Sequence, residues 1–298
     1  MLLNHKISFT FYIRSILPQA LLIFLFANGI VFLKFFSSWV LVVPIAIAAI
    51  LGTCIALLLA FRTNQAYDRW WEARIAWGAI VNDSRSLIRQ LQLFVANGPD
   101  RDSLLHAFVE RQCAFCFVLG DTLRRQDVTE RLQQFLSVND SQRVAQATNK
   151  PNALLLEQGL AMRSLYDSEQ LTDYQLVQLS TTLNNLTDSM GRCERIKNTV
   201  FPRTYTFNMQ VFIYLFATIL PFCLDPVHYL LDVPLVTLLS SAFILIEKSA
   251  IQLQDPFENK PTDTPMTSIA QTIEIDLKSM TAYSPLPDKQ IPQTYYSL

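Results

Sequence analysis

Four stretches of the chain are free of charge and approach the length that a bilayer demands. A helix needs about 20 apolar residues to cross a hydrocarbon core ~30 Å thick. The first two stretches run from Ser15 to Leu33 and from Trp39 to Phe61. The other two run from Phe207 to Leu224 and from Val233 to Ile246, and the last is short for a span unless its ends extend it. The pattern predicts four transmembrane helices.

The sequence between residues 62 and 206 is polar, rich in arginine and poor in glycine, and no part of it alternates apolar with polar residues for long. It therefore predicts a helical domain. Because cytoplasmic segments carry an excess of Lys and Arg, this domain is expected in the cytoplasm. The connection 222–234 carries Asp225 and Asp232 but no Lys or Arg, which predicts that it lies outside. Four crossings then leave both termini in the cytoplasm of a multi-pass cell-membrane protein.

The predicted organisation follows from these boundaries. From the N-terminus it comprises a cytoplasmic segment (1–14), two transmembrane helices (15–61), a helical cytoplasmic domain (62–206), two more transmembrane helices (207–247), a cytoplasmic C-terminal segment (248–282) and an extended or disordered tail (283–298). Proline is well tolerated at the start of a helix, so Thr264 and Pro265 predict a cap for a last helix over 266–277.

A seam for helix packing is predicted near the end of the cytoplasmic domain. Apolar residues there recur with alternating spacings of three and four; they are Leu176, Leu179, Leu183, Leu186, Met190 and Cys193. Such spacing is typical of helix bundles and of coiled coils, and the short run favours a bundle.

Composition agrees with a membrane protein. Charged residues make up 16% of the chain, against about 25% in soluble domains. The formal net charge of -1 argues against a nucleic-acid partner. Cys113 and Cys116 form a CxxC, which without a second such pair is a weak zinc or redox signal beside the alternative of buried helix neighbours. No hydrolase, phosphate-binding or dinucleotide motif occurs, so we expect neither an enzyme, nor a cofactor, nor a metal site.

Two stripes run along the second apolar stretch. Small residues recur at every fourth position; they are Ala48, Gly52, Ala56 and Ala60. Small residues let helices approach closely in lipid, so this face predicts a helix contact, either with a symmetry-related copy or within one subunit. One residue further on lie Ala49, Thr53, Leu57 and Phe61. If the small face packs on a copy, the second stripe can face a shared axis as a hydrophobic constriction.

The second apolar stretch continues without Gly or Pro into the run FRTNQAYDRWWEARIAWG at 61–78. We therefore expect one helix to emerge from the membrane into the cytoplasm. Its charged residues lie within helical reach of one another; they are Arg62, Asp68, Arg69, Glu72 and Arg74. Its aromatic residues are expected at or just beyond the interface; they are Tyr67, Trp70, Trp71 and Trp77. Spacing alone predicts that the run forms an aromatic belt at the interface together with a salt-bridge network.

The same run resembles the signature of the bestrophin family. Three further stretches are similar to its prokaryotic members: CERIKNTVFP (193–202), DPFE (255–258) and QTIEIDL (271–277). The resemblance implies a homopentameric ion channel with a central pore and a large helical cytoplasmic domain. It implies a hydrophobic neck at Phe61, Leu57 and Thr53, where family necks more often carry an aliphatic residue than a threonine. It also implies a second constriction at the cytoplasmic exit, which spacing puts near Tyr174.

Calcium-activated family members carry an acidic cluster after the Pro-Phe motif. The stretch 258–263 here offers Glu258 and Asp263 with Lys260 between them, too few carboxylates for the 6–8 oxygens that Ca²⁺ usually takes. We therefore expect a Ca²⁺-independent pore that passes monovalent inorganic ions passively. Family precedent favours anions such as chloride. The alternatives are a cation-selective (sodium) channel of the same fold and a membrane-anchored sensor or scaffold without conductance.

Overall fold

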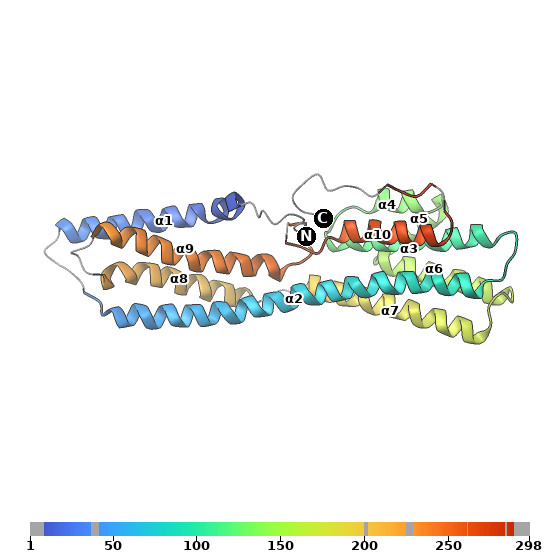
Figure 1. The fold of residues 1–298 in the computed structure, drawn as a ribbon, viewed down its shortest axis with the longest axis horizontal. Helices are drawn as coiled ribbons and strands as arrows, with labels where there is room; N and C mark the ends of the chain where they lie inside the picture. The colour runs from blue at the N-terminus through green and yellow to red at the C-terminus, as the bar shows by residue number, and fades with distance from the viewer. Residues whose placement is uncertain are drawn as a thin grey trace. The chain divides into compact units, whose positions relative to one another are not determined.

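The computed structural model describes residues 9–36, 42–199, 202–224, 229–260, 262–283 and 285–288. Its elements are the helices α1 (Phe9–Phe36), α2 (Ile45–Phe94), α3 (Arg101–Leu123), α4 (Thr129–Phe135), α5 (Val138–Gln146), α6 (Lys150–Asp167), α7 (Asp173–Asn198), α8 (Arg203–Cys223), α9 (Tyr229–Gln254) and α10 (Met266–Met280) (Figure 1). No strand occurs within these described ranges. The prediction of an all-α chain is confirmed.

The four helices α1, α2, α8 and α9 are long and apolar enough to cross a membrane, which confirms the four predicted spans. The last span is longer than the sequence suggested. Asp232, expected in an external connection, lies inside α9 and is buried. Pro234 lies inside this helix and does not end it, although an interior proline removes one intrahelical hydrogen bond and crowds the preceding turn. At the other end α9 continues past Glu247 to Gln254.

The chain divides into two compact units. The first, called the apolar unit, comprises α1, α2 as far as Arg69, α8 and α9. Within it α9 packs against both α1 and α8 (Figure 1). Its core consists of small, branched and aromatic side chains, including Ile23, Ala27, Ile55, Leu59, Ile213, Phe216, Ala217 and Val236. Lys248 ties α9 to α1 by donating to the Ser15 carbonyl and, at 2.8 Å, to Gln19 Oε1.

The second, called the polar unit, comprises α2 from Trp70 onward, α3 to α7 and α10. Its centre is α3, which packs against α4, α6, α7 and α10. Every residue from Gln112 to Gly120 on α3 is buried. This middle stretch is apolar on nearly every side of the helix, and such a stretch is buried all round, which accounts for the central place of α3.

The seam predicted on α7 is confirmed. Leu179, Leu186, Met190 and Cys193 are buried in the core of the polar unit, and Leu176 and Leu183 pack against it. The helix begins with a capping box, in which the Thr172 side chain accepts from the Gln175 backbone N–H and the Gln175 side chain accepts from the Thr172 N–H. Such reciprocal bonds satisfy two amide groups that a helix start leaves unpaired.

The predicted cap of the last helix is wrong in one respect. Thr264 does not cap α10: the residue before the helix is Pro265, and no side chain caps this start. The helix also continues beyond 277 to Met280. Thr264 is instead buried, and its backbone N–H donates to the Pro256 carbonyl at 3.1 Å. The threonine therefore closes the preceding loop.

Cys113 and Cys116 are buried neighbours on α3. Burial raises the pKa of both thiols, that of Cys116 to about 12, so both remain protonated. The interpretation as buried helix neighbours is confirmed. In the described part of the chain, no group of His, Cys, Asp and Glu side chains is placed to hold a metal ion.

A buried lysine joins α10 to α3. Lys278 Nζ donates to Glu274 Oε1 at 2.9 Å and lies 3.3 Å from Glu110 Oε1. Burial opposes its charge, but the hydrogen bond that it donates to Glu274 and the negative charge of Glu110 outweigh burial and raise the pKa of Lys278. Tyr283, where the predicted tail begins, lies under this lysine and against the ring of His106. Most of that tail, 289–298, lies outside the described residues.

Candidate functional site

The stripe of Thr53, Leu57 and Phe61 lies on a face of α2 that the rest of the described chain leaves uncovered. Leu57 and Phe61 are 57% and 59% exposed, and Thr53 is exposed too. Successive helical residues are about 100° apart, so the three side chains span an arc of about 80°. The buried residues of this segment point away from it, between about 180° and 240° from Thr53; they are Ala48, Ile55, Leu59, Arg62 and Ala66. The stripe and the packed face are on opposite sides of the helix.

Thr53 brings a hydroxyl into this otherwise apolar stripe. Its Oγ1 donates to the Ala49 carbonyl on its own helix at 2.8 Å. The bond uses the hydroxyl proton and leaves only acceptor lone pairs toward the open side. The Thr53 end of the stripe is thus less polar than a free hydroxyl would make it.

The small-residue stripe does not stay on one face. Four residues turn a helix by about 400°, so each step drifts by about 40°. Ala48 is accordingly buried, Gly52 is partly buried, and Ala56 and Ala60 are exposed. A Cβ at Gly52 would lie 3.3 Å from the ring of Phe216 on α8 of the same chain. The glycine therefore serves packing within one subunit, and only the later half of the stripe is open to a copy.

Replacing Gly52 by leucine is expected to loosen the apolar unit itself. The new side chain would meet the Phe216 ring, and overpacking of this kind costs about 1–3 kcal/mol. Thermal unfolding of the detergent-solubilised protein should show a lower midpoint. Gly29→Leu on α1 is the matched control, because no atom lies within 4 Å of a Cβ added there. Equal midpoints for Gly52→Leu and wild type would contradict the assigned contact.

Arg62, the first charge of the signature run, is buried. Its Nη1 donates to Glu247 Oε1 on α9 at 3.2 Å, and its Nη2 donates to Thr206 Oγ1 at 3.0 Å. The guanidinium also lies over the ring of Tyr205, whose hydroxyl donates to the Leu58 carbonyl at 3.0 Å. Arg62 thus ties α2 to α8 and α9 and takes no part in a surface network.

The remaining signature charges are also distributed among separate elements. In the apolar unit, Arg69 Nε donates to the Gln254 carbonyl at the end of α9 at 3.0 Å. In the polar unit, Glu72 forms an ion pair with Arg195 on α7, and Arg74 lies over the ring of Trp70. The salt-bridge network read from spacing alone is therefore replaced by links to distant parts of the sequence.

The aromatic residues of the run divide as well. Trp70 Nε1 donates to the Thr262 carbonyl at 2.8 Å, and its ring lies beside that of Trp71. Tyr67 and Trp71 are about half exposed. Trp77 is fully buried in the core of the polar unit. Its expected place in an interfacial belt is wrong, because by that point α2 has entered the packed bundle.

The loop after the Asp-Pro-Phe-Glu motif is closed by its own carboxylates. Asp263 Oδ2 accepts from the backbone N–H groups of Glu258 at 2.5 Å and Lys260 at 3.0 Å. Glu258 pairs with Lys197 at 2.6 Å, which lowers the pKa of Glu258. Burial raises the pKa of Asp263 against the opposing effect of its amide donors. Both acidic side chains of the stretch are thus engaged within the protein.

Tyr174, the predicted second constriction, is the second residue of α7 in the polar unit. It is 89% exposed, and Val177, three residues further along the same helix, is 65% exposed. The two form an exposed apolar pair, of which the sequence predicted only Tyr174. Val177 could have been predicted as part of this pair, because it is an apolar residue three positions after Tyr174 that does not belong to the buried leucine seam.

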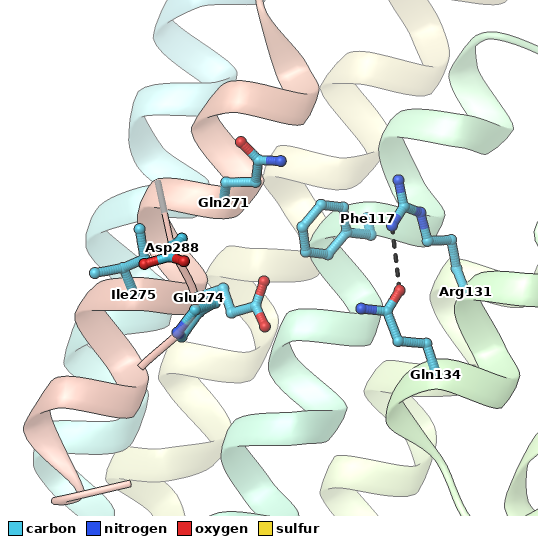
Figure 2. Close-up of a pocket in the computed structure, with 8 residues that line it drawn as sticks. Phe117, Arg131, Gln134, Gln271, Glu274, Ile275 and Asp288 are labelled. Atoms are coloured by element: carbon cyan, nitrogen blue, oxygen red, sulfur yellow. Dashed lines mark hydrogen bonds between the residues drawn. The ribbon is translucent and has the colours of Figure 1, made fainter. Parts of the chain in front are cut away.

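A small polar recess of about 150 Å³ lies among α3, α4, α10 and residues 287–288 (Figure 2). Two of its three charged side chains, those of Arg131 and Glu274, are engaged within the protein. Arg131 pairs with Asp121 at 3.3 Å and lies over Phe117, and Glu274 accepts from Lys278. Figure 2 also shows the bond from Arg131 to Gln134. The recess therefore assembles no nucleophile and base, and the exposed stripe of α2 is the better candidate site.

Comparison with known proteins extends over both units. Residues 10–279 match the family model described as Bacterial/Fungal Bestrophin protein. The voltage-dependent anion channel-forming protein YneE of Escherichia coli strain K12 is 35% identical over 289 residues, covering 96% of this chain and 93% of that protein. Protein alr2987 of Nostoc sp. strain PCC 7120, named in the same way, is 32% identical over 247 residues, covering 81% and 79%. The crystal structure of a bacterial bestrophin homolog from Klebsiella pneumoniae aligns with a TM-score of 0.83 at 28% identity, covering 91% of this chain and 100% of that one.

Proposed function

The chain belongs to the bestrophin family and is a channel rather than an enzyme, and on that premise we propose that five copies surround a central pathway for monovalent anions. The observation that carries the proposal is the exposed stripe of Thr53, Leu57 and Phe61, opposite the packed face of α2. An apolar face that one chain leaves open is available to line a shared axis. Ala56 and Ala60, exposed beside it, are available for contact with the neighbouring copy.

In this proposal the stripe forms a hydrophobic neck. Rings of Phe61 and Leu57 narrow the pathway, and Thr53 forms its outer end. An apolar constriction of this kind gates ions by excluding water. Tyr174 with Val177 forms a second constriction at the cytoplasmic exit, supported by the exposure of both side chains.

The proposed orientation follows the distribution of charge. The polar unit, which holds most of the arginines, lies in the cytoplasm together with both termini. The apolar unit spans the cell membrane. Ions then cross from the outer end of α2 through the neck into the cytoplasmic part.

Chloride is the favoured ion because two relatives are named anion channel-forming proteins. The neck carries no fixed charge that chooses a sign. A direct test is chloride efflux from liposomes containing the purified protein, with its mass measured by light scattering. Chloride efflux from a pentamer supports the proposal. Sodium flux without chloride flux would indicate the cation-selective alternative, and a folded protein without flux would indicate a scaffold.

Conductance is expected to be independent of Ca²⁺. Asp263 Oδ2 accepts two backbone N–H groups and Glu258 pairs with Lys197, so the loop offers far fewer free carboxylate oxygens than the 6–8 ligands that Ca²⁺ usually takes. Currents in chelator and in roughly 100 µM free Ca²⁺, above the ~10⁻⁷–10⁻⁵ M range of sensor sites, should coincide. Mg²⁺ at the same concentration is the control for ionic effects. A selective response to Ca²⁺ would contradict this expectation.

A further inference from the structure

Asp68 lies on the same side of α2 as the proposed neck. With about 100° per residue, its side chain points about 60° from Thr53, inside the arc of about 80° that ends at Phe61. It is exposed, and it belongs to the apolar unit together with the whole stripe. Since α2 is one uninterrupted helix, Asp68 lies about 10 Å beyond Phe61 along the axis at 1.5 Å per residue. It is the first acidic residue on this helix after the stripe.

The cations close to Asp68 in sequence are directed elsewhere. Arg62 is buried against Glu247 and Thr206, about 120° around the helix from Asp68. Arg69 Nε donates to the Gln254 carbonyl. Among the residues that the structure describes, no ion pair or hydrogen bond engages the Asp68 carboxylate. Within the described part of the subunit, no cation therefore neutralises its charge.

We propose that Asp68 is a selectivity-determining residue, whose five carboxylates form a negative ring just inside the neck and reduce the preference of the channel for anions. This inference rests on the proposed function. A ring of like charges raises the local concentration of counter-ions and opposes co-ions. The apolar neck itself selects no sign, so the ring at its exit contributes directly to the ratio of chloride to potassium permeability.

The range of the effect follows from screening. The Debye length is about 10 Å at 0.1 M salt and about 30 Å at 0.01 M. The distance from the ring to Phe61 is about 10 Å along the helix. The ring therefore acts on ions in the neck at low salt and only weakly at molar salt.

The test is the reversal potential of Asp68→Asn in planar bilayers under a KCl gradient. We expect the ratio of chloride to potassium permeability to rise roughly three-fold or more at low salt, as neutralising several charges at this distance implies. The reversal potential should move toward the chloride equilibrium potential, and the shift should shrink near 1 M salt. Asp102→Asn, which removes an exposed charge from α3, is the matched control and should leave the reversal potential unchanged.

A second test moves the negative charge from position 68 to a position nearer the neck. Asn64 is exposed on the same arc, one helical turn nearer the neck. Asn64→Asp combined with Asp68→Asn should restore the wild-type permeability ratio. Asp68→Ser serves as a second neutral variant with a smaller side chain. The recordings compare only variants that elute from size-exclusion chromatography at the volume of the wild-type oligomer.

The outcomes separate this inference from the proposed function. A wild-type protein without conductance would refute the channel itself. A conducting wild type whose neutral variants keep its reversal potential at low salt would overturn the role of Asp68 alone. Loss of the oligomer on neutralisation, with no shift in the channels that remain, would also overturn it, because the carboxylate would then serve subunit contact.

Discussion

A double substitution of Leu57→Ala and Phe61→Ala is expected to raise the open probability roughly ten-fold, equivalent to ~1.4 kcal/mol in the balance of closed and open states. Both side chains are exposed on the open face of α2, so their removal leaves no cavity in the core of the subunit. A wider and less apolar ring wets more readily, which removes the barrier to ions. Single-channel recording of purified protein measures the change directly.

The control for this experiment is a matched pair on another helix. Leu25 and Phe32 on α1 have similar exposure in the single chain. Their replacement by alanine removes the same apolar groups away from the stripe and should leave open probability unchanged. Wild-type currents from the Leu57 and Phe61 double variant would remove the stripe from its proposed role. Equal activation by both pairs would point to a general loosening of the apolar unit.

Arg62→Met is expected to be the most destabilising single change in the apolar unit. It leaves Glu247 buried without its partner, and breaking a buried ion pair from one side costs about 3–5 kcal/mol. The thermal midpoint of the detergent-solubilised protein should fall strongly. Combining it with Glu247→Met should recover most of the loss, because the double change removes both buried charges.

Arg163 supplies the comparison for this prediction. It pairs with Asp167 on α6, where both side chains are largely exposed. Exposed pairs contribute about 0–1 kcal/mol, so Arg163→Met should barely change the midpoint. If Arg62→Met and Arg163→Met lowered the midpoint by equal amounts, the buried pair would not have the structural role assigned to it.

The arrangement of α2 shows what periodicity predicts well. The absence of Gly and Pro predicted one continuous helix from the apolar stretch into the polar run, and α2 has that form. A spacing of four put Thr53, Leu57 and Phe61 on one side, and all three are exposed together. Their role in a neck stays a prediction. The drift of a four-residue repeat also explains why the small-residue stripe passes from packed to open.

Partners distant in sequence were beyond such reasoning. Spacing along α2 suggested that Arg62 and Glu72 form ion pairs with residues of their own helix. Their partners are instead Glu247 on α9 and Arg195 on α7. Those pairings depend on how helices pack in three dimensions, which no local pattern contains. Trp77 shows the same limit, since its residue type predicts an interface as readily as a buried core.

The most direct test of the central claim is the reversal potential of the wild-type protein in a planar bilayer under a KCl gradient. The proposed channel predicts unitary currents that reverse on the chloride side of zero. Their size should not change on adding Ca²⁺. Reversal near the potassium equilibrium potential would contradict anion conduction, and a verified folded oligomer that carries no current under any voltage would contradict the channel.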